Sequence, residues 1–333
     1  MIPTNGMVVR WVVCILMLLP LLAIGKDKRQ QEAVALLAKA RELSDIRADD
    51  TLPFRLRARV LLWTSSKGSV EGSYLLTCAS RNRWREEIQF PGFKQVRLRL
   101  EGQLWRSRNV IYQPLRIQTL AAVMDFPSRL RLSMWNEHAK RLFDRTRNNA
   151  RTRCLDLQGG KTAGRTICFD PSSGVVVSSE NRFSLDEFSE YAPWLGKMFP
   201  RRIRFLDSGK LALEVFVDQL AQEAVADESL FVPPRGAEIW PTCDEPMLPH
   251  ALKVPEPPYP ERVHRINAKV LVSIVVGASG KVERAQVLET PAPEFSVATT
   301  ETVLRSWRFQ PATCNGSAIP YEVYVEVAFR STP

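Results

Sequence analysis

Val270-Leu-Val-Ser-Ile-Val-Val276 is a short β-branched apolar run, typical of a buried strand. The turn residues Ala278-Ser279-Gly280 follow it, and residues 282–288 continue as a second strand. A helix is expected over 295–304 and a closing strand over 321–329. The order ββαβ predicts a small α+β domain.

Further residues of this region stand in a fixed order around those elements. Pro258-Tyr259-Pro260 precedes the first strand, Gly280-Lys281-Val282 makes its turn, and Trp307-Arg308-Phe309 precedes Val323-Tyr-Val-Glu-Val-Ala-Phe329. With this set, residues 257–333 resemble the C-terminal domain of the TonB energy-transducer family.

The resemblance implies a non-enzymatic cell-envelope protein that binds a protein partner, such as a TonB-dependent receptor, in transport or envelope assembly. In that family an exposed edge strand accepts an extended receptor peptide by β-augmentation. Carried over to this sequence, the partner-binding residues are Tyr259, Pro260, Tyr321, Val323, Tyr324, Val325 and Val327. The alternative for Trp307, Phe309 and the alternating valines is a purely structural place in the core.

The segment before this domain is rich in proline. Nine prolines fall between Pro233 and Pro260 and leave no room for a helix or a central strand. We therefore expect a semi-stiff linker over 233–256 that separates the C-terminal domain, 257–333, from a domain over 26–232.

The preceding domain shows strand patterns with helices at one end. Residues 54–60 and 96–100 alternate apolar side chains with arginines, which predicts a sheet with one covered and one solvated face. Helices are expected over 27–46 and, after Pro114, over 115–124. The apolar stripe of the first helix comprises Ala33, Val34, Leu36, Leu37, Ala40 and Leu43. Residues 127–150 remain ambiguous. These patterns predict the α+β class, with an antiparallel sheet.

The order of these elements, with Cys168-Phe169-Asp170-Pro171 and Gly174-Val175-Val176, resembles the LolA-like lipoprotein carriers. The resemblance implies a curved antiparallel half-barrel whose apolar concave face holds an acyl chain. The alternative function is thus a periplasmic carrier of a lipid or lipoprotein acyl chain. The cavity walls would be Trp63, Trp84, Trp105, Phe126 and Trp135, although an ordinary core is the competing interpretation for these rings.

Composition and charge exclude several classes. The 333 residues are 45% hydrophobic and 25% charged, unlike a disordered chain or a polytopic membrane protein. The net charge is +10, and residues 81–153 hold 17 Lys and Arg against 6 Asp and Glu. Arginines on alternate strand positions indicate a solvated face, or else a docking face for anionic head groups. Export argues against a nucleic-acid partner.

The N-terminus carries an export signal. Arg10 precedes an apolar run of 14 residues, 11–24, and Ala23-Ile24-Gly25 offers small residues at a cleavage site. We expect residues 1–25 to be a cleaved signal peptide and the protein to lie in the periplasm. Fourteen helical residues span about 21 Å, less than a bilayer core, but an uncleaved inner-membrane anchor through residues 11–24 is the alternative.

Export permits disulfides among the five remaining cysteines. Cys154 and Cys168 lie symmetrically about a Gly-rich turn, so they are expected to face each other on a hairpin. Cys78 lies in an apolar run and is expected to be a buried, inert thiol. Cys243 and Cys314 remain and are predicted to pair.

Motifs of catalysis are missing from the sequence. It has three histidines, no HExxH or GxSxG motif, and no Cys–His spacing that fits zinc. We therefore expect no enzyme activity, no catalytic residues, no metal site and no cofactor.

Overall fold

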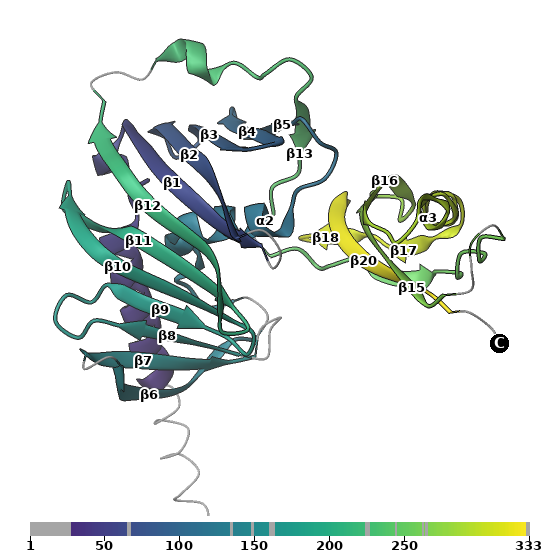
Figure 1. The fold of residues 1–333 in the computed structure, drawn as a ribbon. Coiled ribbons are helices and arrows are strands. Elements are labelled where there is room, and N and C mark those ends of the chain that lie inside the picture. The colour runs from purple at the N-terminus through teal and green to yellow at the C-terminus, as the bar shows by residue number, and fades with distance from the viewer. Residues whose placement is uncertain are drawn as a thin grey trace, which may run out of the picture. The chain divides into compact units, whose positions relative to one another are not determined.

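The computed structural model describes residues 28–64, 68–133, 136–147, 150–159, 164–223, 227–243, 245–261, 263 and 266–330 (Figure 1). Contacts divide the chain into two compact units. The first unit comprises Met1–Arg81 and Gln118–Ala226, and the second comprises Asn82–Ile117 and Asp227–Pro333. The predicted signal peptide lies outside the described residues, and the domain limits given above stay predictions.

Among its described residues, the first unit holds one antiparallel sheet with the strand order β6-β7-β8-β9-β10-β11-β12-β1-β2 (Figure 1). The bounds are β1 (Phe54–Thr64), β2 (Gly68–Ser80), β6 (His138–Arg147), β7 (Ala150–Gln158), β8 (Arg165–Phe169), β9 (Val176–Glu180), β10 (Ser184–Trp194), β11 (Lys197–Asp207) and β12 (Lys210–Gln222). This sheet, accompanied by helices, confirms the α+β class.

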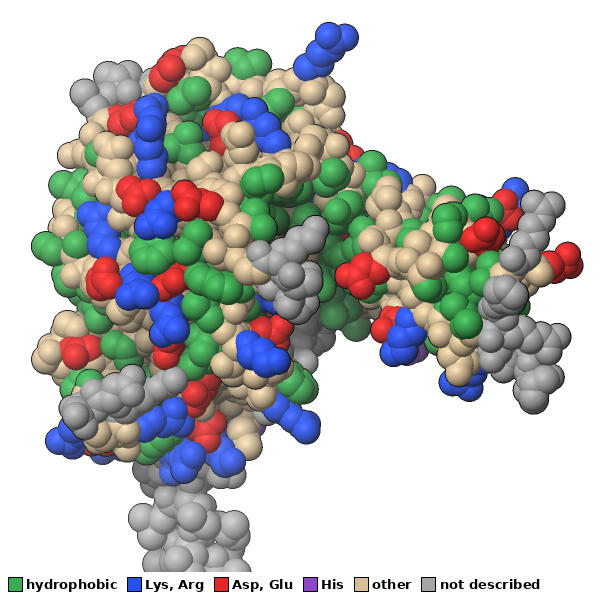
Figure 2. All heavy atoms as spheres, in the orientation of Figure 1, with side chains coloured by type: hydrophobic (Ala, Val, Ile, Leu, Met, Phe, Trp, Pro, Cys, Tyr) green, Lys and Arg blue, Asp and Glu red, His purple; other side chains and the backbone are tan. Residues whose placement is uncertain are grey.

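Strand β1 shows the predicted alternation of faces. Phe54, Leu56, Ala58 and Val60 are at most 3% exposed, whereas the arginines between them point to the other face. There Arg55 pairs with Glu223 at 2.9 Å. Figure 2 shows acidic and basic side chains interspersed over the visible surface. This pattern fits a solvated, ion-paired face.

A helix over residues 28–44 lies against β6 and β7 of the first unit. The backbone N–H of Ala139 donates to Gln30 Oε1 at 2.9 Å, and Arg153 pairs with Glu32 at 3.4 Å. The predicted stripe is buried at Ala33, Leu37 and Ala40 but wrong at Val34, which is 48% exposed. A helix buries only the face that it turns to the sheet, and this face is narrower than the predicted apolar stripe.

The other helices of the chain's middle part and strand β6 differ in how well the sequence predicts them. Helix α2 (Leu115–Met124) follows Pro114 as predicted. The ambiguous segment 127–150 contains part of the 3₁₀ helix η2 (Phe126–Arg129) and strand β6. A second 3₁₀ helix, η1 (Asp49–Thr51), precedes β1.

Among the described residues, the second unit contains two larger groups of strands and two strand pairs. One has the order β13-β5-β4-β3, with β3 (Arg83–Phe90), β4 (Phe93–Leu100), β5 (Gln103–Arg108) and β13 (Glu238–Trp240). The other is a three-stranded sheet of order β16-β15-β20, with β15 (Ala268–Val276), β16 (Val282–Glu289) and β20 (Tyr321–Phe329) (Figure 1). Its other elements are η3 (Glu228–Phe231), β14 (His250–Lys253), α3 (Pro293–Ser306), β17 (Arg308–Gln310), β18 (Ala312–Cys314) and β19 (Ser317–Ile319).

The core of the three-stranded sheet forms beneath α3. The β15 side chains Val270, Val272 and Ile274 are fully buried and pack with Phe295 of α3. Gly280 explains the tight turn after β15, because its φ is +77° and a Cβ there would collide with the carbonyl of Phe309. Only glycine tolerates that position.

The proline-rich segment is more ordered than a linker. Strand β13 pairs with β5, and β14 pairs with β17. The expectation of a semi-stiff linker over 233–256 is therefore wrong in these two windows. Each window lacks proline, and a strand at a sheet edge needs backbone hydrogen bonds on one side only.

Both predicted disulfides are confirmed. Cys154 and Cys168 are register partners on β7 and β8, with Cα atoms 4.0 Å apart. Cys243 and Cys314 are bonded with Cα atoms 5.9 Å apart. The remaining described cysteine, Cys78, is buried.

We expect the Cys78 thiol to resist alkylation in the native protein. Burial raises its pKa to about 12, so thiolate is scarce at pH 8. Iodoacetamide should leave the folded, oxidised chain over residues 26–333 unmodified and add one group after denaturation, as measured by intact mass. Native labelling of Cys78 at the rate of a free peptide thiol would contradict this.

Candidate functional site

Strand β20 lies at the edge of its sheet. It pairs with β15 over the whole run from Tyr321 to Phe329, and β15 is its one partner in the part of the chain that the structure describes. Its other edge therefore offers unpaired backbone N–H and C=O groups, which are a template for a further strand.

An apolar groove of about 440 Å³ runs along this edge. Three valines of β20 line it on one side, namely Val323, Val325 and Val327, together with Glu326, Ala328 and Arg330. The opposite wall comprises Pro249, Ala251, Val254, Pro255, Glu256 and Pro257, and the ring systems of Trp307 and Phe309 also contribute. Because residues of both strand faces contribute from β20, the groove meets the strand at its edge.

The wall opposite β20 belongs to residues 245–257, which we call the strap. The Cys243–Cys314 disulfide tethers the chain just before it. Met247 and Thr313 exchange two backbone hydrogen bonds of 2.9 and 3.1 Å. Trp307 Nε1 donates to the carbonyl of Pro255 at 3.0 Å. The strap is thus fixed at both ends beside the groove.

The start of β20 carries a buried charge cluster. The Glu322 side chain is 7% exposed and accepts from Arg108 at 2.9 Å, from Arg106 at 3.5 Å and from the backbone N–H of Gln113 at 2.5 Å. Arg106 also pairs with Glu238 at 2.6 Å. Burial and the neighbouring Arg108 lower the pKa of Arg106 to about 10, and the two carboxylates oppose that shift. The cluster joins β20 to β5 and β13 within the second unit.

The predicted partner-binding residues divide between two places. Val323, Val325 and Val327 line the groove, whereas Tyr321 and Tyr324 lie on the same strand but do not. The Tyr259 ring packs against Phe295 and Phe329, with centroid distances of 5.5 and 6.3 Å.

The hydroxyl of Tyr259 is also engaged. It donates to the carbonyl of Ile266 at 3.0 Å and accepts from the backbone N–H of the same residue at 2.8 Å. Pro260 is half-buried and lies outside the groove lining. Tyr259 and Pro260 thus shape the entry to β15, and their predicted partner contact stays a prediction.

The residues that sequence reasoning missed are those of the charge cluster and the strap. Arg106 and Arg108 stand more than 200 positions before Glu322, with separations of 216 and 214 residues. No local pattern marks such a pairing. The prolines of the strap led to the prediction of a linker. The apolar residues Leu252 and Val254, two positions apart, could have indicated a strand there.

The aromatic residues proposed as cavity walls are divided between the two units, and their role stays a prediction. Trp63 and Phe126 belong to the first unit, Trp84 and Trp105 belong to the second, and Trp135 lies outside the described residues. Phe126 is 2% exposed and packs on Phe188 with a centroid distance of 4.5 Å. None of the four described rings lines the groove or the pocket below.

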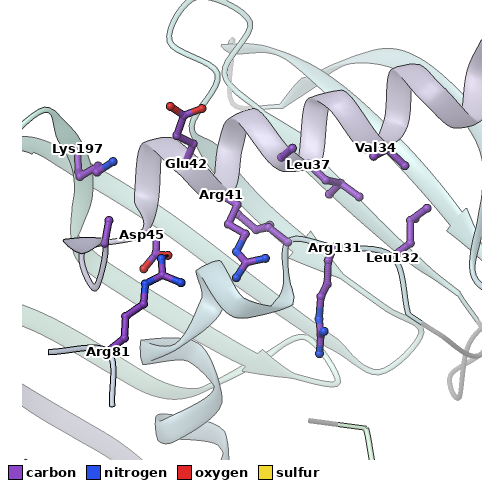
Figure 3. Close-up of a pocket in the computed structure, with 12 residues that line it drawn as sticks. Val34, Leu37, Arg41, Glu42, Asp45, Arg81, Arg131, Leu132 and Lys197 are labelled. Atoms are coloured by element: carbon purple, nitrogen blue, oxygen red, sulfur yellow. Dashed lines mark hydrogen bonds and ion pairs between the residues drawn. The ribbon is translucent and has the colours of Figure 1, made fainter. Parts of the chain in front are cut away.

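The first unit holds a separate pocket of about 550 Å³ (Figure 3). Its apolar lining comes from one face of the helix at 28–44 and from the segment after η2, with Val34, Leu37, Ala38, Leu130 and Leu132. Its charged lining comprises Arg41, Glu42, Asp45, Arg81, Arg131 and Lys197. Arg81 pairs with Asp45 at 2.9 Å. The pocket thus combines an apolar wall with a mostly cationic rim.

Comparison with known families bears on the region of the groove. Residues 255–331 match the model of the Gram-negative bacterial TonB protein C-terminal family. The match confirms the resemblance predicted for 257–333. The TonB-type region contains β20, α3 and most of the groove lining, while most of the strap precedes it.

Comparison with solved structures returns a LolA superfamily protein among other envelope proteins. A LolA superfamily protein from Nitrosomonas europaea is 13% identical, with a TM-score of 0.41 over 60% of this chain and 97% of that chain. A putative outer membrane lipoprotein-sorting protein domain from Vibrio parahaemolyticus is 13% identical, with a TM-score of 0.39 over 59% and 95%. The Pseudomonas aeruginosa MucA/MucB complex is 14% identical, with a TM-score of 0.30 over 83% and 98%.

A search of curated proteins found no match. Within the described ranges, no helix is long and apolar enough to cross a membrane. The same residues contain no group of three or more His, Cys, Asp or Glu side chains placed to hold a metal ion.

Proposed function

We propose that this is a non-enzymatic cell-envelope protein whose C-terminal region binds an extended segment of a protein partner by β-augmentation. The observation that carries the proposal is the unpaired edge of β20 above an apolar groove. A TonB-dependent receptor is the kind of partner that the family match supports. The predicted export signal supports a periplasmic location.

The chemistry of the edge favours a polypeptide ligand. Unpaired backbone groups of β20 require a partner that offers donors and acceptors at strand spacing, which an extended peptide does. The valines beneath add apolar contact area. Backbone pairing would supply affinity, and the groove would supply selectivity.

The experiment measures binding of a synthetic peptide to the full exported chain. The probe is acetyl-Lys-Thr-Val-Thr-Val-Thr-Val-Thr-Lys-amide with a fluorescent label, followed by anisotropy. Two further forms carry N-methyl groups on all valine amides or on all threonine amides. Successive N–H groups of a strand point to opposite edges, so one form should bind like the parent and the other should not bind. Equal binding of both forms, or no binding of the parent, would overturn the proposal.

A proline in β20 should abolish this binding. We expect Val325→Pro or its neighbour Glu326→Pro, whichever points its N–H away from β15, to fold and to bind the probe at least about tenfold more weakly. The other variant loses a hydrogen bond to β15 and serves as the structural control. Circular dichroism and anisotropy separate the two effects. If both proline variants fold and bind the probe with wild-type affinity, β20 is not the docking strand.

The pocket of the first unit favours a second candidate function, a carrier of a lipid or lipoprotein acyl chain. An apolar wall beside Arg41 and Arg131 fits a chain with an anionic head group. We expect Val34→Arg to abolish binding of a fluorescent dodecanoic acid probe to the full chain. Phe183→Arg, which replaces another exposed apolar residue outside the pocket lining, should leave it unchanged. Equal binding by both variants would remove this candidate.

A further inference from the structure

We propose that the strap is the second wall of the peptide site and selects peptides with large apolar side chains at alternate positions. This inference rests on the proposed function and defines its ligand class. The wall is a part of the chain that mostly precedes the family match, which begins at residue 255.

The strap is held in place independently of any ligand. The Cys243–Cys314 disulfide, the Met247–Thr313 pair and the Trp307–Pro255 hydrogen bond fix it at three successive points. Strand β14 within it pairs with β17. A wall with these anchors is preformed, so a ligand need not order it on binding.

The groove between strap and β20 continues the hydrophobic core past the sheet edge. Val327 belongs to that core, and Val323 and Val325 pack against it. These side chains are two residues apart and point to one face of β20. A strand added at the edge would direct every second side chain to the same face, under Val254 and Pro255 of the strap. Apolar side chains at those positions would extend the core.

The remaining side chains of the groove fit a peptide better than a lipid. Glu256 of the strap and Arg330 after β20 are exposed, and neither forms an ion pair in the part of the chain that the structure describes. Charges of both signs flank the apolar lining, whereas an anionic amphiphile would require a cationic rim. The unpaired backbone groups of β20 would find no partner in an acyl chain.

Two exposed residues of the strap provide a matched pair of variants. Val254 is 44% exposed and lines the groove, whereas Leu252 is 67% exposed and does not. Leu252 is the bulged residue of β14, between Ala251 and Lys253. Replacing either residue with serine changes an exposed position, so both variants should fold.

The test uses the full chain and three labelled peptides. The first is the alternating Thr/Val probe, the second has the three valines adjacent, and the third has serine in place of each valine. We expect the adjacent-valine peptide to bind about tenfold more weakly than the alternating one, and the serine peptide not to bind. Val254→Ser should weaken binding of the alternating probe about fivefold to tenfold, and Leu252→Ser should leave it unchanged.

The outcomes separate this inference from the proposed function. If wild type does not bind the alternating probe, β-augmentation at this site fails. Suppose that wild type binds the alternating probe. If the adjacent-valine and serine peptides bind as tightly as this probe, or if Val254→Ser and Leu252→Ser both bind it with wild-type affinity, the peptide pairs with β20 without help from the strap. That result would overturn the strap as a selecting wall and leave the edge-strand proposal standing.

Discussion

Replacing Glu322 with alanine is expected to lower the free energy of unfolding of the second unit by about 3–5 kcal/mol. The Arg106 and Arg108 side chains are 5% and 4% exposed, and Glu322 pairs with both. Without this carboxylate, the buried guanidinium groups of Arg106 and Arg108 lose the acidic partner that they share, and Arg106 keeps its pair with Glu238. Burial lowers the pKa of Arg106, which indicates that its charge is poorly solvated. Breaking a buried pair therefore costs much more than forming it gains.

A neighbouring glutamate supplies the control. Glu326 lies on the same strand and pairs with Lys269 at 2.8 Å, but the two side chains are 56% and 71% exposed. Glu326→Ala should cost no more than about 1 kcal/mol. Hydrogen exchange of β15 and β20 peptides at increasing guanidinium concentration measures both variants in the full chain. Similar losses for the two variants would show that the Glu322 cluster is not a buried structural pair.

The strands and helices of the TonB-type region were predictable because local pattern decides them. Strand β20 has the predicted bounds, and α3 and β15 differ from the predicted bounds by one or two residues. Strand β15 is a continuous apolar run that ends before Gly277, α3 begins at Pro293, and β20 follows Pro320 with valines at alternate positions. The Cys154–Cys168 pairing was predictable for the same reason, since a hairpin brings symmetric positions together.

The candidate site was predictable only in part. The valines of β20 were named from the sequence, and three of them line the groove. The strap, the role of Trp307 as its anchor, and the Glu322 cluster depend on contacts between distant segments. Contacts between distant segments produce no periodic pattern in the sequence. Val34 shows that a local pattern can also mislead. An amphipathic pattern identifies an apolar residue but does not predict whether a neighbour covers it.

Removing the Cys243–Cys314 disulfide by paired serine substitutions should also destabilise the second unit. The cysteines are 71 residues apart, and closing a loop of that length restricts the unfolded chain by roughly 4 kcal/mol in the chain-entropy model. The cross-link also anchors the strap, together with the Met247–Thr313 hydrogen bonds and the pairing of β14 with β17. We therefore expect both a large loss of unfolding free energy and faster hydrogen exchange at Met247 and in β14.

The second disulfide of the chain is the matched control. Cys154 and Cys168 are 14 residues apart on paired strands, and serine substitution there should cost roughly 3 kcal/mol. That loss should fall on β7 and β8 of the first unit and leave exchange in β20 unchanged. The Cys243→Ser and Cys314→Ser double variant should speed exchange in the second unit and leave exchange in β7 and β8 unchanged. If it leaves exchange in β14 and the guanidinium midpoint of β20 unchanged, the strap is held by its hydrogen bonds alone. The disulfide would then have no part in shaping the groove.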